Sequence, residues 1–270
     1  SPHWGHYNIE RGIIMLEMRH VSQRFEKDIL IDQSYIFPSI GFIGIVGASG
    51  CGKTTLLYIL SGLLKPDQGE IYFNNVPLDQ DFLAKHVTFI RQNNDMIASL
   101  NVEDNIEIGC KIANLSGLEK LPGIVYQLDI KRCLKKYPSA LSVGQRKRVS
   151  IARSLLKASD VILCDEPTGA LHQEAGHEVM QMLKKASSQA LVLIVSHDED
   201  LLKTYCDEIV ILENGRLKGT THEAHYEIIP ERKKKHYSLL PYAIKEVRFR
   251  AKRLISLICF QIILLSCLLF

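Results

Sequence analysis

The chain has 270 residues, of which 46% are hydrophobic and 23% are charged, and this allows one or two domains with a sizeable buried core. Its seven cysteines include no C-x-x-C pair and no Cys/His cluster. This spacing excludes a disulfide framework and favours free thiols in a reducing cytosol. Residues 1–14 lack the apolar core of a secretory signal. We expect Met15 to be the native start and residues 1–14 to be foreign to the natural chain.

The net charge of +3 conceals an uneven distribution along the chain. Residues 231–253 carry nine Lys or Arg and two Glu, which leaves 24 basic and 28 acidic residues elsewhere. A basic segment attached to a mildly acidic body indicates contact with a membrane surface or with nucleic acid.

The first third of the sequence favours β-structure. Short apolar runs punctuated by Gly, Asp and Pro predict strands at 16–18, 29–31, 35–37, 43–46 and 71–73, with a further strand at 87–90. Residues 95–140 are less apolar and have a mostly helical pattern. Three near-continuous apolar runs separated by helices then predict parallel strands buried on both faces. These runs are 161–164, 191–195 and 209–212.

The last 17 residues, 254–270, contain no charge. A membrane-spanning helix needs about 20 apolar residues, with a range of roughly 17–25, so this segment lies at the lower limit. The alternative is a buried core helix. Five Lys or Arg between 245 and 253 favour a span whose N-terminal side is cytoplasmic. We expect the natural protein to continue past Phe270.

Residues 47–55 read Gly-Ala-Ser-Gly-Cys-Gly-Lys-Thr-Thr and match G-x-x-x-x-G-K-[ST] between an apolar run and a helical run. In such a loop the backbone N–H groups and the helix N-terminus bind phosphate oxygens. Lys53 can reach the β- and γ-phosphates, and the Thr54 hydroxyl can hold Mg²⁺. The alternative is a glycine-rich turn with a solvated lysine. The residues predicted to surround the phosphates are Gly47, Ala48, Ser49, Gly50, Cys51, Gly52, Lys53, Thr54 and Thr55.

Two carboxylates follow the apolar run 161–164. Asp165 is predicted to lie at the carboxyl edge of the sheet near Mg²⁺. Glu166 is predicted to act as the general base for a water behind the γ-phosphate. The alternative is that the two acids cap a helix that starts at Pro167-Thr168.

Three further segments fall in loops or at a helix start. Ser142 is predicted to cap a helix that runs to Lys157, with a buried apolar stripe and a basic opposite side. Such a helix start is either a second phosphate-binding end or only a capped helix. Gln92 follows the strand at 87–90, and His197 follows the strand at 191–195. Their alternatives are a solvated glutamine and a structural histidine.

Taken in order, these motifs resemble the nucleotide-binding domain of an ABC transporter, over about residues 16–218. The resemblance implies an α/β P-loop NTPase fold with a mixed sheet, a β-rich N-terminal subdomain and a helical subdomain at about 93–150. It implies an ATP-binding domain over 15–222. A basic connector at 223–253 and an incomplete first transmembrane helix at 254–270 would follow.

The resemblance also implies the cofactors ATP and Mg²⁺ and a second copy of the domain, placed head to tail so that each copy closes over the ATP of the other. Phe25, 22 residues before Gly47, matches the aromatic residue that stacks on adenine. Gln92 matches the glutamine that senses Mg²⁺ and the permease. The other implied roles are the signature acting in trans for Ser142, Gly144 and Gln145, the metal-side carboxylate for Asp165, the catalytic carboxylate for Glu166, and the γ-phosphate contact for His197.

Residues 165–171 look like the branch of macrolide exporters, lipoprotein-releasing ATPases, the cell-division ATPase and peptide-antibiotic pumps. This implies an ATP-hydrolysing motor at the cell membrane, on the cytoplasmic side, that exports a drug, peptide or lipoprotein or transmits force. Its partners would be a permease domain and the membrane, without nucleic acid. The alternatives are a soluble ATPase that acts on nucleic acid or ribosomes, and a degenerate regulatory subunit.

Two positions depart from the family pattern. Val143 stands where glycine is common, and a β-branched residue is costly there if the backbone needs a positive φ. His172 stands where aspartate is usual, in the loop that would contact the second subunit. We expect this histidine to affect the coupling between two ATP sites more than ATP binding.

Overall fold

The computed structural model describes residues 16–74, 76–91, 96–113, 115, 117–169 and 171–219. The first 14 residues, Gln92, the basic connector and the apolar segment 254–270 lie outside these residues. None of the helices in the described part has both the length and the apolar character needed to cross a bilayer.

The central element is a six-stranded sheet, sheet B, with the strand order β10-β9-β3-β8-β7-β6. Five of its strands are parallel, and β10 is antiparallel to β9. The predicted parallel strands at 161–164, 191–195 and 209–212 are thereby confirmed. The strands are β3 (Gly41–Val46), β6 (Val87–Ile90), β7 (Val161–Asp165), β8 (Leu191–Val195), β9 (Glu208–Glu213) and β10 (Arg216–Lys218).

A second, antiparallel sheet, sheet A, has the order β2-β1-β4-β5. The apolar runs at 29–31 and 35–37 are parts of one continuous strand. Residues between them pair with β1, which carries register shifts at this point. The strands are β1 (Leu16–Arg24), β2 (Asp28–Phe37), β4 (Gln68–Phe73) and β5 (Val76–Pro77).

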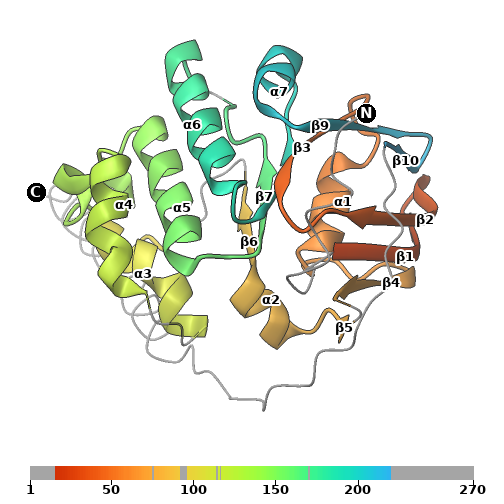
Figure 1. Ribbon diagram of the computed structural model, residues 1–270, viewed down its shortest axis with the longest axis horizontal. Coiled ribbons are helices and arrows are strands. Elements are labelled where there is room, and N and C mark those ends of the chain that lie inside the picture. The colour runs from red at the N-terminus through yellow and green to blue at the C-terminus, as the bar shows by residue number, and fades with distance from the viewer. Residues whose placement is uncertain are drawn as a thin grey trace, which may run out of the picture.

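Helices cover sheet B on one side, while α1 and sheet A lie on the other (Figure 1). The predicted helical region between 95 and 140 contains α3, α4 and three short 3₁₀ turns. The helices are α1 (Lys53–Leu60), α2 (Gln80–His86), α3 (Val102–Ala113), α4 (Leu121–Gln127), α5 (Val143–Lys157), α6 (Gln173–Ala186) and α7 (Glu199–Tyr205), with 3₁₀ turns η1 (Leu118–Lys120), η2 (Lys131–Cys133) and η3 (Pro138–Ala140).

Two apolar cores hold these layers together, one on each face of sheet B. Phe42 of β3 packs with Ile151 of α5 in the core under the helices. Its neighbour Ile43 points to the opposite face and packs with Leu57 of α1 in the core under sheet A. Successive side chains of a strand alternate between faces, so a strand with a core on both sides must be apolar at almost every position.

Helix α5 corrects one part of the sequence prediction. The basic residues were expected on its exposed side, but Lys147 and Lys157 are only 1% and 9% exposed. Both reach backbone carbonyls of the β6 segment: Lys147 Nζ donates to Arg91 O at 3.2 Å and Lys157 Nζ to Val87 O at 2.5 Å. Ten helical residues rise about 15 Å and four strand residues about 13 Å, so the two lysines reach opposite ends of β6.

Burial lowers the pKa of Lys157 from its usual 10.5 to about 8, although Cys110 and Asp160 act in the other direction. Between these pH values the unfolded chain binds more protons than the folded chain, so this lysine makes stability rise with pH. Between pH 7 and pH 11, we expect the unfolding free energy of the parent to rise by about 3 kcal/mol more than that of Lys157→Met.

Urea unfolding of both proteins across this pH range measures the difference between their unfolding free energies. Other titrating groups contribute equally to both proteins, so their contributions cancel in this difference. Lys65→Met, at an exposed position, is the control and should follow the parent. Parallel profiles for the parent and Lys157→Met would contradict the prediction.

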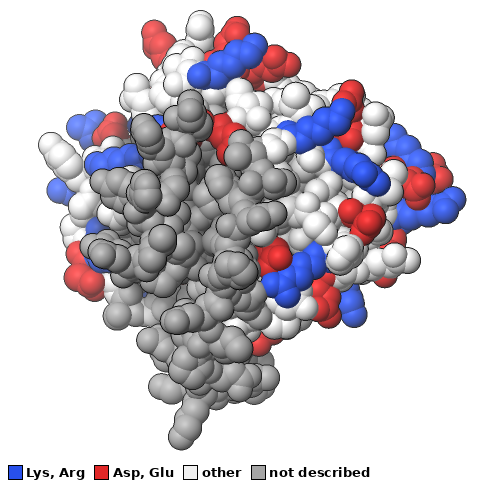
Figure 2. Space-filling model, turned by 45° about the vertical axis from the view of Figure 1, so that its right-hand side comes forward, with Lys and Arg blue, Asp and Glu red and all other residues white. Residues whose placement is uncertain are grey.

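On the described part of the face in Figure 2, basic and acidic side chains are interspersed. Ion pairs between neighbouring strands and turns fit this pattern, such as Lys218 with Glu213 at 2.5 Å and Arg24 with Asp28 at 3.6 Å. Pairs this exposed contribute little to stability, so the two cores are the main source of stability.

Candidate functional site

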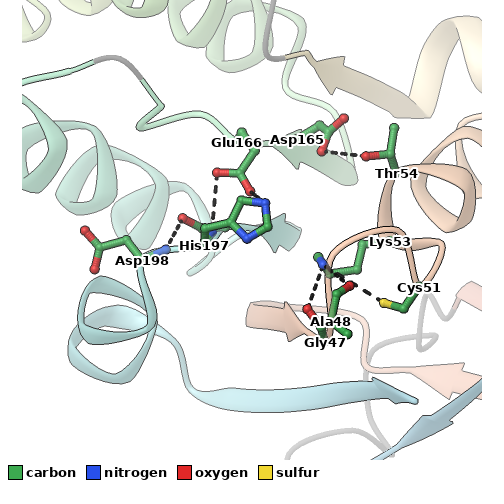
Figure 3. A network of polar contacts seen from close by, with 10 residues as sticks. Gly47, Ala48, Cys51, Lys53, Thr54, Asp165, Glu166, His197 and Asp198 are labelled. Carbon is green, nitrogen blue, oxygen red and sulfur yellow. Dashed lines mark hydrogen bonds and ion pairs between the residues drawn. The ribbon is translucent and has the colours of Figure 1, made fainter. Parts of the chain in front are cut away.

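The candidate residues meet at the carboxyl edge of sheet B. Ile45 near the end of β3 pairs with Val195 at the end of β8, and Val195 also pairs with Asp165 at the end of β7. The loops that follow these three strands therefore leave the sheet side by side (Figure 3). In open sheets with parallel strands, ligands bind at this edge.

The phosphate loop, residues 47–55, is held in a conformation that requires glycine. Gly52 has a φ of 108° and caps α1. A Cβ at Gly52 would overlap the Ile29 side chain, and one at Gly47 would overlap the Leu212 carbonyl. A Cβ at Gly50, which has a φ of 69°, would meet nothing within 4 Å. The phosphate loop thus packs against β2 and β9 at Gly52 and Gly47, and it has unfilled space next to Gly50.

Lys53 lies across this loop and is only 7% exposed. Its Nζ donates to the Gly47 carbonyl at 2.8 Å and to the Ala48 carbonyl at 3.0 Å (Figure 3). The Cys51 sulfur lies 4.0 Å from the same nitrogen. A buried ammonium next to the backbone N–H groups of a glycine-rich loop is a strong site for anionic oxygens.

Thr54 and Asp165 face each other across the gap between α1 and β7. The Thr54 hydroxyl donates to Asp165 Oδ1 at 3.2 Å. Burial raises the pKa of the Asp165 carboxyl, while the Thr54 hydrogen bond and the positive charges of Arg91, Lys147 and Lys53 lower it. A hydroxyl and a carboxylate at this distance are the oxygen ligands that Mg²⁺ prefers.

Glu166 has a left-handed backbone, with a φ of 50°. Its N–H donates to the Val195 carbonyl at 2.9 Å, which holds the residue against β8. A non-glycine residue in this region costs on the order of 1–3 kcal/mol, and such residues cluster at functional sites. The next helix starts only at Gln173, so the alternative in which the two acids cap a helix at Pro167-Thr168 is wrong.

The Glu166 carboxylate is directed toward His197 (Figure 3). His197 Nε2 lies 3.4 Å from Oε1, and the His197 backbone N–H donates weakly to Oε2 at 3.4 Å. Oε1 is buried and has no hydrogen bond within the described residues. Burial raises the pKa of Glu166, and His197 lowers it. A buried carboxylate oxygen without a hydrogen bond is uncommon in a folded protein and calls for a functional explanation.

The loop after β8 is fixed by its own hydrogen bonds. The Ser196 hydroxyl accepts from the Asp198 N–H at 3.1 Å, and Asp198 caps α7 by accepting from the Leu201 N–H at 3.0 Å. His197 stands between them with an exposed side chain. A depression of about 240 Å³ joins Glu166 and His197 to His172, the residue before α6.

The signature residues form the N-terminus of α5. The Ser142 hydroxyl accepts from the Gln145 N–H at 3.2 Å, and Gln145 Oε1 accepts from the Ser142 N–H at 3.1 Å. This capping box confirms Ser142 as the predicted helix cap. Val143 and Gly144 are not among the residues with a positive φ. The possible strain at Val143 therefore does not arise.

Phe25 lies in the bend between β1 and β2 and is 57% exposed. Four residues later, Ile29 contacts the phosphate loop, so the ring is tethered close to that loop. Base–aromatic stacking contributes roughly 1–3 kcal/mol. We expect Phe25→Ala to raise the KM for ATP about fivefold to tenfold with kcat nearly unchanged, as steady-state kinetics can measure.

The matched control for Phe25→Ala is Tyr126→Ala. Tyr126 lies on α4 and is 84% exposed. It should keep the KM of the parent. An unchanged KM in Phe25→Ala would show that its ring does not contact the base.

Of the predicted residues, Gln92 lies outside the described part of the chain. Arg91 and Lys147 were not predicted, yet both lie close enough to act on Asp165. Their signal in the sequence is weak because Arg91 is a lone basic residue after a strand and Lys147 lies within a run of basic residues. Only the fold turns them toward the site.

The fold and this edge of the sheet define a P-loop nucleotide hydrolase. A family model described as ABC transporter matches residues 32–169, and the chain belongs to the ABC transporter family. The predicted fold class, an α/β P-loop NTPase of this family with a mixed sheet, is confirmed, whereas the predicted transmembrane helix lies outside the described residues. The chain is an ATPase domain of this family.

Relatives and solved structures agree with this assignment. The chain is 36% identical over 214 residues to the macrolide export ATP-binding/permease protein MacB 2 of Aeromonas hydrophila, which covers 75% of this chain and 33% of the relative. It is 33% identical over 219 residues to the methionine import ATP-binding protein MetN 1 of Staphylococcus epidermidis, which covers 75% of this chain and 64% of the relative.

The structure is similar to the dimeric post-hydrolysis state of the ATP-binding cassette MJ0796 bound to ADP and Pi, with a TM-score of 0.67 and 28% identity. That match covers 78% of this chain and 100% of the cassette. The chain spans about a third of the length of the macrolide export proteins that it matches.

Proposed function

We propose that the chain is the ATP-driven motor of a membrane exporter, joined in the natural protein to a permease. The observation that carries this proposal is the meeting of Lys53, Thr54, Asp165, Glu166 and His197 at one edge of the sheet. Similarity to permease-fused export proteins favours this proposal over a nucleic-acid ATPase or a regulatory subunit.

The geometry supports the proposed roles of the described residues, and the role of Gln92 rests on its place in the sequence. The loop N–H groups and Lys53 bind the phosphates, and Thr54 and Asp165, with Gln92, hold Mg²⁺. When bound, Mg²⁺ neutralises charge on the β- and γ-phosphates. Glu166 accepts the proton of the water that attacks the γ-phosphorus, and the bond between the γ-phosphorus and the oxygen of the leaving ADP breaks. His197 holds the Glu166 carboxylate in place and contacts the γ-phosphate. The residues proposed to contribute to binding are Phe25, Gly47, Ala48, Ser49, Gly50, Cys51, Gly52, Lys53, Thr54 and Thr55.

We further propose that two copies pair head to tail. Ser142, Gly144 and Gln145 of one copy would then close over the ATP on the phosphate loop of the other. The dimeric state of the MJ0796 cassette supports a dimer. The helix start at Ser142 supports the contact because its N–H groups favour an anion.

The membrane location rests on the sequence and the relatives together. The basic connector and the apolar segment 254–270 would place the ATPase domain on the cytoplasmic side of the cell membrane. The exported substrate would be a drug, peptide or lipoprotein. In a permease-fused exporter, the part that selects it lies beyond the ATPase domain.

Steady-state phosphate release from MgATP tests the proposal, together with sedimentation with and without ATP. We expect Mg²⁺-dependent hydrolysis and an ATP-dependent dimer. If neither this chain nor the full-length protein in lipid hydrolyses ATP, the motor proposal is wrong. Hydrolysis by a strictly monomeric protein would contradict the head-to-tail arrangement alone.

His172 provides a test of the coupling between the two sites. It is exposed, precedes α6, makes no capping hydrogen bond and lines the depression next to Glu166. We expect His172→Asp to change the turnover rate or the Hill coefficient for ATP about twofold or more, since it places a carboxylate at the dimer contact. Steady-state kinetics identical to the parent would remove His172 from the coupling.

A further inference from the structure

Helix α5 carries a buried positive charge, that of Lys147, next to the ends of β6 and β7 at the candidate site. Lys147 is 1% exposed, which is rare for a lysine. Its Nζ donates to the Arg91 carbonyl at 3.2 Å. Arg91 directly follows β6 and directly precedes Gln92. Burial of an ammonium costs free energy unless nearby polar groups compensate its charge. Contacts with those groups therefore fix the position of the Lys147 ammonium.

The register of sheet B brings Asp165 into the same region. Ile90 of β6 pairs with Cys164 of β7, so Arg91 and Asp165 leave neighbouring strands at the same level. Neighbouring strands lie about 5 Å apart. The Lys147 ammonium, which contacts the Arg91 carbonyl, is therefore placed beside the ends of both β6 and β7.

We propose that Lys147 is a positioning residue. Its hydrogen bond holds Arg91, the residue after β6, against the helix that Ser142 caps, and its ammonium places a fixed positive charge next to Asp165. This inference rests on the proposed role of Asp165 in holding Mg²⁺. It connects three parts of the site: the signature end of α5, Arg91 at the end of β6, and the metal-side carboxylate.

Loss of this charge has two effects of opposite sign. A cation near a metal site repels the metal, so its removal strengthens Mg²⁺ binding at Asp165. The same removal takes away the donor that holds the Arg91 carbonyl beside the end of β7, so the reacting groups are less well placed and turnover falls. Simple damage to the fold would weaken both Mg²⁺ binding and turnover.

The same helix supplies the control. Lys157 is also buried on α5 and also donates to a carbonyl of β6, but at Val87, the end far from the site. Lys157→Met removes a buried ammonium and its hydrogen bonds from the same helix–strand contact. Any effect that is specific to the site must therefore appear at Lys147 and not at Lys157.

The experiment compares Lys147→Gln and Lys147→Met with the parent and with Lys157→Met. The affinity for a fluorescent ATP analogue is measured in EDTA and in Mg²⁺. The Mg²⁺ concentration that gives half-maximal hydrolysis and the kcat are measured as well, and thermal unfolding shows whether each variant is folded. We expect both Lys147 variants to increase the Mg²⁺ enhancement of analogue binding about threefold to tenfold. Their kcat should fall about tenfold, and Lys157→Met should match the parent in both readouts.

Several results would overturn the inference. Lys147 variants that match Lys157→Met would show that the lysine only supports the helix, and so would failure of both Lys147 variants to fold when Lys157→Met folds. If the parent itself neither binds the analogue nor responds to Mg²⁺, the proposed function fails, and the inference fails with it. If the parent responds normally but the Mg²⁺ enhancement is unchanged in Lys147→Gln, only this inference is wrong.

Discussion

Glu166→Gln is expected to lower steady-state ATP hydrolysis at least a hundredfold while ATP affinity stays within about twofold of the parent. General-base catalysis contributes roughly 10²–10⁴-fold, and the amide has no basic oxygen to accept the proton. The substitution preserves the size of the side chain, and Glu166 lies beside the phosphate loop rather than in it. Phosphate release and binding of a fluorescent ATP analogue measure the two quantities.

The same variant should also accumulate as an ATP-dependent dimer in sedimentation, because ATP that is bound but not hydrolysed keeps the two copies closed. Glu199→Gln is the matched control: this exposed glutamate on α7 pairs with Lys203 at 3.2 Å, and its loss should not change turnover. Hydrolysis by Glu166→Gln within tenfold of the parent would assign the base to another residue.

Lys53→Met is expected to weaken ATP binding about a hundredfold or more. The ammonium donates to the Gly47 and Ala48 carbonyls and is the buried cation of the phosphate loop. Hydrogen bonds to charged groups contribute about 1.5–3 kcal/mol each, and Lys53 would make them to phosphate oxygens. Methionine keeps the length of the side chain and removes only the charge and the donors. Analogue titration measures the loss.

Lys65→Met, at an exposed position five residues after α1, is the control for a general loss of positive charge and should bind ATP like the parent. Thermal unfolding of both variants separates a local effect from loss of the fold. A folded Lys53→Met protein that binds ATP with unchanged affinity would contradict the proposed phosphate site.

The fold was largely predictable because its central strands are buried on both sides. Such strands must be apolar throughout, and so 161–164, 191–195 and 209–212 stood out in the sequence. The joining of 29–31 and 35–37 into the single strand β2 was not predictable. Polar residues separate these runs, and their strand pairing depends on β1.

The candidate site divides in the same way. The phosphate loop, Asp165, Glu166 and His197 lie at or just after the ends of strands, so their order along the chain places them at one edge of a parallel sheet. The left-handed backbone of Glu166, with its N–H bonded to the end of β8, has no local signal. It comes from a contact between residues 29 positions apart in the chain.

The amino-acid sequence alone therefore determined the family, the parallel strands of the central sheet and most of the candidate nucleotide site, because these depend on local motifs and on apolar runs. The tertiary structure alone decided that Val143 is unstrained, that Glu166 has a buried oxygen in need of a donor, and that Lys147 and Lys157 are buried rather than solvated. Each of these depends on which distant element packs against the residue. A lysine on a helix is solvated by default, and only the packing of α5 against β6 brings these two ammonium groups to backbone carbonyls.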